Sequence, residues 1–159
     1  MLRLLVCMLL ALSLTLGTLS ATAASNTIMI LKTTVDGGRL RDGPTSAYNV
    51  IRSLGQGEKV FFAGQTSDAF CLVRTAKGET GYIYRGFLTP YGVVRMDQVY
   101  YAGGTVRVYR RPSTSASRVG TLGANDHVLV FATSGDWALI KTLNGGTGFA
   151  RLSELNSIV

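Results

Sequence analysis

The 159-residue chain is poor in the residue types that make cross-links and metal sites: it has two cysteines, one histidine and three prolines. Cys7 lies in an N-terminal apolar segment. Cys71 is the one cysteine outside it, so the rest of the chain cannot form an intramolecular disulfide. A single histidine and a single cysteine cannot complete a structural zinc site. We therefore expect no metal, no cofactor, and a fold held by packing alone.

Groups that could catalyse a reaction are equally few. His127 stands between Asp126 and Val128, where we expect a solvated residue at the start of a strand. Cys71 lies in an alternating apolar segment, and we expect a small buried hydrophobic residue. A nucleophilic Cys–His pair would require the two side chains to meet from different domains. The nine carboxylates form no paired motif and no glycine-rich phosphate loop is present, so the sequence predicts a protein that is not an enzyme.

The first residues have the order of a secretory signal peptide. Arg3 is the single charged residue before Lys32, residues 4–19 are almost continuously apolar, and Ala-Thr-Ala follows at 21–23. The apolar run is shorter than the roughly 20 residues that span a bilayer, and an uncleaved anchor is the alternative. We expect a signal peptide over residues 1–24, export to the periplasm or the extracellular envelope, and no transmembrane segment after cleavage.

Acidic residues are also scarce in the part of the chain that follows the expected signal peptide. Removing Arg3 from the 16 basic residues leaves 15 against nine acidic ones, a net charge of +6. A basic surface suits an anionic partner such as cell-wall polymer, lipid headgroup or nucleic acid. Export disfavours nucleic acid among these three.

The remainder of the chain is an internal repeat. Residues 39–44 correspond to 107–112 at an offset of 68, with arginine first and proline last in both. Residues 70–75 correspond to 137–142 at an offset of 67, so one residue is lost between the two motifs. A single-residue gap inside a loop is typical of two copies of one fold. The oligomeric state and the packing of one copy against the other are left open.

Each copy shows the pattern of a small β domain. Short alternating apolar runs are separated by glycine-rich turns, Asn144-Gly145 is a strong hairpin signal, and no amphipathic helix is evident. We predict an all-β protein with two small β-barrels in tandem, over 27–89 and 94–159, joined by the short link 90–92. The residues expected in the two cores are Leu40, Val50, Leu54, Val60, Val73, Ile83, Val108, Leu122, Val128, Ile140 and Leu155.

Three motifs recur in the same order in both copies. They are an opening segment at 40–45 and 108–113, a middle segment at 70–74 and 136–141, and a closing segment at 81–83 and 148–150. Together they resemble the bacterial Src homology 3 (SH3)-like domain, a small barrel found in tandem in many exported bacterial proteins. The resemblance implies non-catalytic binding, most often to cell-wall peptidoglycan or to another envelope protein. Tyr109, Arg111 and Glu154 depart from the family pattern, which leaves the ligand preference open.

Pro44 and Pro112 cannot donate a backbone hydrogen bond, so the segments around them cannot pair as strands. We therefore expect the side chains next to each proline to lie on the outside of the barrel. Arginine and aromatic side chains there could bind carboxylates and sugars. The predicted ligand-binding residues are Arg41, Tyr48, Tyr109, Arg110, Arg111 and Trp137. The alternatives are a solubilising basic face and rings that pack into the core. We expect a cell-wall glycopeptide or anionic envelope polymer as partner; the alternative is an adaptor that recognises an extended peptide of an envelope protein.

Overall fold

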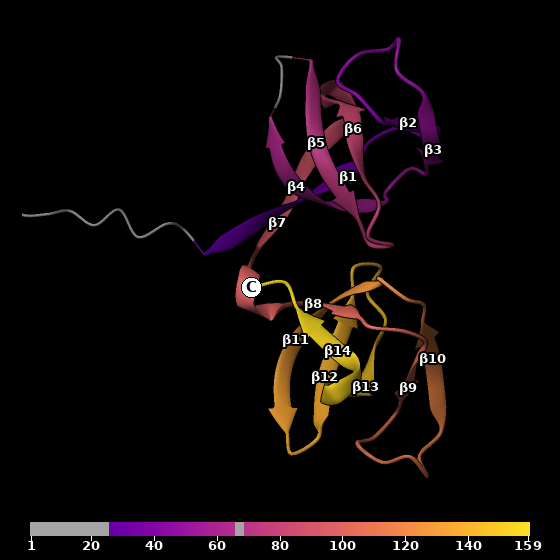
Figure 1. Ribbon diagram of the computed structural model, residues 1–159, viewed down its shortest axis with the longest axis vertical. Coiled ribbons are helices and arrows are strands. Elements are labelled where there is room, and N and C mark those ends of the chain that lie inside the picture. The colour runs from indigo at the N-terminus through magenta and orange to yellow at the C-terminus, as the bar shows by residue number, and fades with distance from the viewer. Residues whose placement is uncertain (1–25, 66–68) are drawn as a thin grey trace, which may run out of the picture.

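The computed structural model describes residues 26–65 and 69–159, and their regular structure consists of strands and three short 3₁₀ helices (Figure 1). The first half contains β1 (Thr27–Thr33), β2 (Gly38–Arg41), β3 (Val50–Leu54), β4 (Lys59–Gln65), β5 (Phe70–Thr75), β6 (Thr80–Tyr84), η1 (Arg85–Phe87) and β7 (Leu88–Arg95). The second half contains η2 (Met96–Gln98), β8 (Val99–Ala102), β9 (Val106–Tyr109), β10 (Arg118–Leu122), β11 (His127–Ser134), β12 (Trp137–Thr142), β13 (Thr147–Arg151), η3 (Leu152–Glu154) and β14 (Leu155–Ser157).

The strands form two separate seven-stranded sheets with one shared topology. The first has the order β3-β2-β6-β5-β4-β1-β7, and the second has the order β10-β9-β13-β12-β11-β8-β14. Adding seven to each label of the first order gives the second, so the prediction of an all-β tandem repeat is confirmed. We call β1–β7 the first barrel and β8–β14 the second barrel.

The segment 89–94, where the sequence places the boundary between the copies, is part of β7. This strand pairs with β1 as far as Arg95, which lies opposite Thr27. The sheet of the first barrel therefore extends to Arg95, and the second barrel begins with the short helix η2. The expected signal peptide lies outside the described residues. Within the described part of the chain, no helix has the length and hydropathy to cross a membrane.

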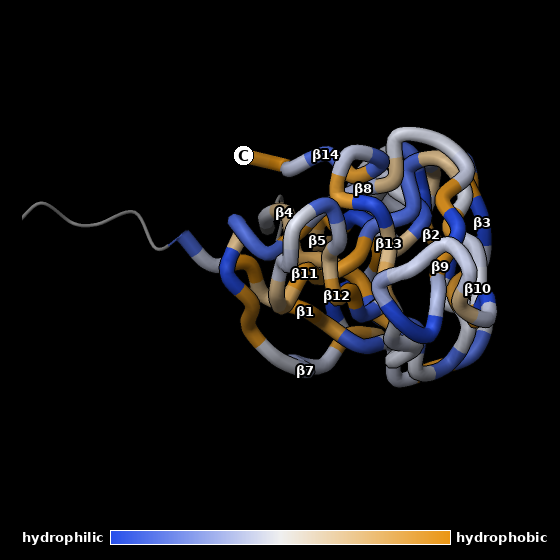
Figure 2. Tube along the Cα trace, turned by 90° about the horizontal axis from the view of Figure 1, so that it is seen from below, coloured by the Kyte–Doolittle hydropathy of each residue, from blue (hydrophilic) through white to orange (hydrophobic). Residues whose placement is uncertain are grey.

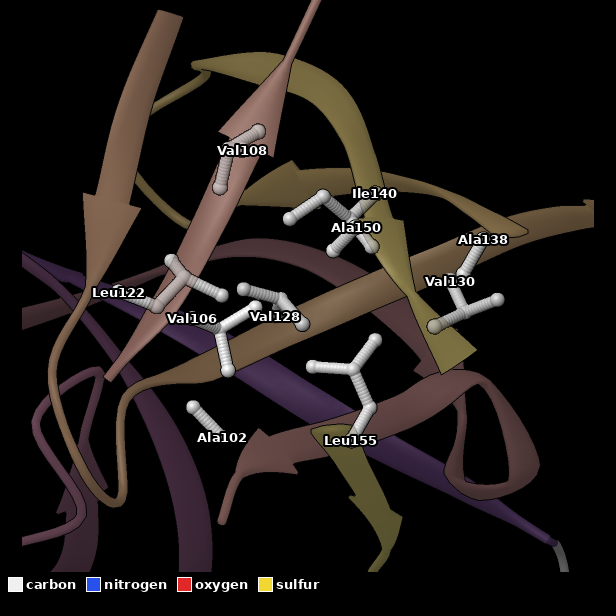
Figure 3. Packing of buried hydrophobic residues seen from close by; sticks show 10 residues of the cluster. All are labelled: Ala102, Val106, Val108, Leu122, Val128, Val130, Ala138, Ile140, Ala150 and Leu155. Carbon is white, nitrogen blue, oxygen red and sulfur yellow. The ribbon is translucent and has the colours of Figure 1, made fainter. Parts of the chain in front are cut away.

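Each barrel encloses its own apolar core (Figure 3 for the second barrel). Every predicted core residue except Val50 is buried. Val50 is 44% exposed, so its assignment to the core was wrong. It begins β3, at the edge of the sheet, and the pairing register shifts between Leu40 and Arg41. This bulge breaks the alternation of inward and outward side chains on which the prediction depended.

A third apolar cluster joins the two barrels. Its buried members are Ile30, Phe61, Val99, Leu129 and Leu143. Figure 2 shows that β1, which contributes Ile30 to this cluster, is largely apolar along its length. The two barrels thus bury apolar surface against each other, which favours one rigid unit over two independently moving domains.

Hydrogen bonds across this contact come in equivalent pairs. Lys59 Nζ donates to the carbonyl of Leu143 at 2.9 Å, and the His127 backbone N–H donates to the carbonyl of Ala76 at 2.7 Å. Lys59 corresponds to His127 in the repeat, and Ala76 corresponds to Leu143. The same surface of each barrel therefore meets its counterpart, as in a two-fold symmetric dimer.

His127 is 6% exposed, which corrects the expectation of a solvated residue. Its ring lies with centroid separations of 5.9 Å from both Phe61 and Tyr101. His127 starts a strand, as expected, but that strand end is covered by the other barrel. Sequence patterns within one copy carry no information about that cover.

The buried His127 ring favours the neutral form. Nδ1 lies 2.8 Å from the Asn125 carbonyl, so Nδ1–H donates there, while Nε2 is buried without a partner among the described residues. Burial lowers the pKa of His127 below its usual value; the Arg74 guanidinium adds to this, while Asn125 and Asp126 oppose it. The Asp126 carboxylate is held by Lys77 Nζ at 2.9 Å and is therefore partly neutralised.

We expect acid to destabilise the protein through this histidine. Because the folded-state pKa of His127 is lowered, the stability is fully present above about pH 6.5 and is lost as the pH falls below it, by at most about 1.4 kcal/mol per pH unit. Urea denaturation between pH 7 and pH 5 measures the slope, and His127→Gln should flatten it. An NMR titration of His127 that gives a pKa at or above 6.5 would contradict this prediction.

Candidate functional site

A shallow depression lies at the same place in each barrel. The first depression is lined by Gly37, Arg39, Arg41, Ser46, Phe70, Tyr84 and Phe87. The second depression is lined by Thr105, Arg107, Tyr109, Thr114, Arg151 and Glu154. Each residue of the second corresponds to one of the first in the repeat, and the volumes are about 390 and 380 Å³. Two diverged copies thus retain a hollow at one position of the fold.

Strand alternation explains why charged side chains reach the first depression. Arg39 and Arg41 flank the fully buried Leu40 on β2, so both point to the outer face. The loop that contains Pro44 follows directly, the start of β5 supplies a ring, and the end of β6 with η1 closes the other side. In the second barrel, Arg107 and Tyr109 flank the buried Val108 in the same manner.

Three aromatic rings build one wall of the first depression. Tyr84 lies edge-on to Phe70 with a centroid separation of 6.0 Å, and edge-on to Phe87 at 5.1 Å. Arg41 Nη1 donates to the carbonyl of Tyr48 at 2.7 Å, which fixes the guanidinium beside the proline loop. The first depression therefore offers flat apolar surface next to cationic side chains.

The second depression is more polar. Tyr109 lies edge-on to Trp137 with a centroid separation of 5.7 Å, and the Arg151 guanidinium lies 4.7 Å from the centre of the Trp137 ring. Arg151 Nη1 also lies 3.2 Å from Asp136 Oδ2. Arg151 takes the place of Tyr84, and Glu154 takes the place of Phe87. A cation and an anion thus replace two rings, so the second depression suits a ligand with more polar groups.

The structure distributes the predicted ligand residues unevenly. Arg41 and Tyr109 line the two depressions, and Trp137 borders the second through its contacts with Tyr109 and Arg151. Tyr48 is exposed and connects to the first depression through its carbonyl.

Arg110 and Arg111 are exposed and lie outside the lining of both depressions. Several lining residues are absent from the predicted set: Arg39, Phe70, Tyr84, Phe87, Arg107 and Arg151. The repeat carried a usable signal for Arg39, because it aligns with Arg107 beside a buried aliphatic residue in both copies. No such signal marked Arg151, because its counterpart is a tyrosine.

The reactive side chains lie apart from the depressions. Cys71 is buried in the core of the first barrel, and burial raises the pKa of its thiol despite the opposing charge of Arg85. A thiol of this kind stays protonated and is a poor nucleophile. Among residues 26–65 and 69–159, no three His, Cys, Asp or Glu side chains group closely enough to hold a metal ion.

A larger and more apolar groove of about 550 Å³ lies where the barrels meet. Met29 of β1 and Val93 of β7 are exposed along it, and Phe62 and Ile158 also contribute to its lining. Arg74 contributes a charged group to the lining. The groove has no counterpart within one barrel, because residues of both barrels form it.

Comparison with known proteins identifies both copies. The family model described as bacterial SH3 domain matches residues 36–89 and 104–156, and each depression lies wholly within one matched segment. Among solved structures, NlpC2 from Trichomonas vaginalis is 18% identical with a TM-score of 0.35; the match covers 82% of this chain and 48% of that one. NlpC1 from the same organism is 19% identical with the same TM-score and coverages of 86% and 48%. The chain thus spans about half the length of these proteins. The comparison with curated proteins finds no significant match.

Proposed function

Because the chain belongs to the bacterial SH3 domain family and carries the domain twice, we propose that it is an exported, non-catalytic binding protein that docks on an anionic polymer of the cell envelope. Peptidoglycan is the partner we favour, because it combines carboxylates with sugar rings. The single observation that carries the proposal is the repeated depression, in which arginines stand beside aromatic rings in both barrels.

The chemistry of the lining residues matches that partner. Arg39 and Arg41 in the first depression, and Arg107 and Arg151 in the second, can donate charge-assisted hydrogen bonds to carboxylates. Tyr84 and its neighbouring rings, and Tyr109 in the second depression, offer flat surfaces for sugars. The net positive charge of the chain supports attraction to an anionic polymer over longer distances.

Co-sedimentation with purified sacculi tests the proposal. The double variant Arg39→Ala/Arg107→Ala removes one equivalent cation from each depression, and we expect about tenfold weaker binding, equal to about 1.4 kcal/mol. Binding of the unaltered protein should also weaken as salt rises from about 0.05 to 0.5 M, because exposed charges are screened.

The matched control is Lys32→Ala/Lys141→Ala, which removes the same charge from β1 and β12 outside the depressions. It should bind nearly as well as the unaltered protein. A second comparison uses Arg110→Ala/Arg111→Ala. This variant measures how much the exposed loop contributes to binding, as distinct from the depression. Equal affinity of the Arg39/Arg107 variant and the lysine control at low salt would contradict the proposal.

The apolar groove supports a second candidate function, an adaptor that binds an extended peptide of an envelope protein. Its exposed side chains Met29 and Val93 would contact apolar residues of such a peptide. The two functions differ in salt dependence, since apolar contacts do not weaken as salt rises. A Met29→Ser/Val93→Ser variant that keeps full binding to sacculi assigns that binding to the depressions.

A further inference from the structure

The two depressions lie at the ends of the barrels that are farthest from the contact between them. In the first barrel, Phe70 begins β5 beside the depression, and the other end of β5 leads to Ala76, whose carbonyl accepts the backbone N–H of His127. In the second barrel, Trp137 begins β12, and the other end of β12 leads to Leu143, whose carbonyl accepts Lys59 Nζ. Each depression is therefore separated from the interface by the length of one strand.

The lengths of these strands set the separation. Both β5 and β12 contain six residues. At about 3.3 Å per residue, a strand of this length spans roughly 17 Å, so the depressions lie on the order of 30 Å apart. The barrels are stacked along the long axis of the molecule in Figure 1, with the β11–β12 hairpin directed away from the first barrel.

The contact between the barrels holds this arrangement in place. Lys77 Nζ lies 2.9 Å from Asp126 Oδ1, and this ion pair adds to the buried apolar cluster and to the hydrogen bonds that Lys59 and His127 donate across the contact. Equivalent surfaces meet across the interface, so the barrels are related by an approximate two-fold rotation. Such a rotation places the two depressions at opposite ends of the molecule, because each lies at the strand end far from the interface.

We propose that the protein is a bivalent bridge, in which the two depressions bind separate anionic glycopeptide segments and one chain links two strands of envelope polymer. This inference depends on the proposed function, because it requires that both depressions bind the polymer. A short ligand cannot reach both depressions, since they lie on the order of 30 Å apart. Two sites on one rigid body can both bind the same polymer strand only if that strand is long enough to span the distance between the sites. Two different polymer strands can be bound without this condition.

A two-step capture assay tests the bridge. Sacculi are immobilised and saturated briefly with protein, unbound protein is washed away, and fluorescent fragments from muramidase-digested sacculi are added. The unaltered protein should retain the fragments. The matched variants Arg39→Ala/Tyr84→Ala and Arg107→Ala/Arg151→Ala change equivalent positions of the first and second depression. Each should still bind the immobilised sacculi but retain at least about tenfold fewer fragments.

A mixture of the two variants provides the decisive control. It should not restore capture, because both intact depressions must lie in one chain. Restored capture would show bridging by self-association and overturn the inference. Excess free protein should abolish the capture of fragments by the unaltered chain. The free protein binds the fragments in solution, so that the protein on the sacculi can no longer bind them. This control needs no variant.

The outcomes separate the bridge from the proposed function. If the unaltered protein does not bind immobilised sacculi, the proposed function fails and the bridge fails with it. If it binds them but retains no fragments, or if the single-depression variants retain as many as the unaltered chain, the bridge alone is overturned. Circular dichroism of each variant establishes that the fold is kept.

Discussion

Replacing Phe61 by alanine is expected to lower the free energy of unfolding by about 3–5 kcal/mol, the usual cost of removing a buried aromatic side chain. Phe61 is 1% exposed and belongs to the apolar cluster between the barrels. It also contacts the ring of His127 across the interface. Alanine would leave a cavity at this contact, and the second barrel would lose part of the surface that covers it.

Urea denaturation followed by two probes measures this effect. Trp137 is the one tryptophan of the chain and lies in the second barrel, so its fluorescence reports on that barrel, while circular dichroism reports on both. Coincident transitions in the unaltered protein would indicate one cooperative unit. In the Phe61→Ala variant, both midpoints should fall, although the substituted residue lies in the first barrel.

Phe131→Ala is the matched control, because Phe131 is 54% exposed and lies on β11. A surface substitution of this kind usually changes stability by less than about 0.5 kcal/mol. If Phe61→Ala costs no more than Phe131→Ala, or if the fluorescence midpoint stays unchanged, the barrels are not coupled through this cluster. In that case the two barrels behave as separate domains.

Replacing Gly148 by alanine is expected to destabilise the second barrel by about 1–3 kcal/mol and to weaken its depression. A Cβ atom at Gly148 would lie 2.5 Å from Val108 Cγ1 and 2.9 Å from the carbonyl oxygen of Tyr109. Strand β9 would have to move away from β13, and Tyr109 lines the second depression. The cost comes from this close approach of the two strands.

Gly120→Ala is the control for Gly148, because a Cβ at Gly120 on β10 has no neighbouring atom within 4 Å. Thermal unfolding gives the stability of both variants, and sacculus binding gives the effect on the site. The equivalent change Gly81→Ala should act in the same way on the first barrel, since its Cβ would lie 2.7 Å from the carbonyl oxygen of Arg41. Similar midpoints for Gly148→Ala and Gly120→Ala would contradict the prediction.

Much of the fold could be predicted from the sequence, because the relevant patterns are local. Leu40 alternates with Arg39 and Arg41, and this alternation alone assigns one side chain to the core and two to the surface. The repeat at offsets of 68 and 67 indicated two copies of one fold, and the shared strand order and the family match confirm it. Cys71 was expected to be buried, and it is.

The tertiary structure decided what depends on contacts between segments far apart in the chain. His127 is buried because the other barrel covers its strand end, and Val50 is exposed because a bulge breaks the alternation at a sheet edge. Arg151 joins the site because β13 places it over Trp137 of β12. The periodicity of apolar residues indicates which face of a strand is covered. The position of one barrel relative to the other depends on apolar residues such as Phe61, which cannot be told from ordinary core residues in the sequence. For this reason the sequence alone determined two basic, aromatic-bearing β domains, and the structure alone decided that their depressions lie at opposite ends of one molecule.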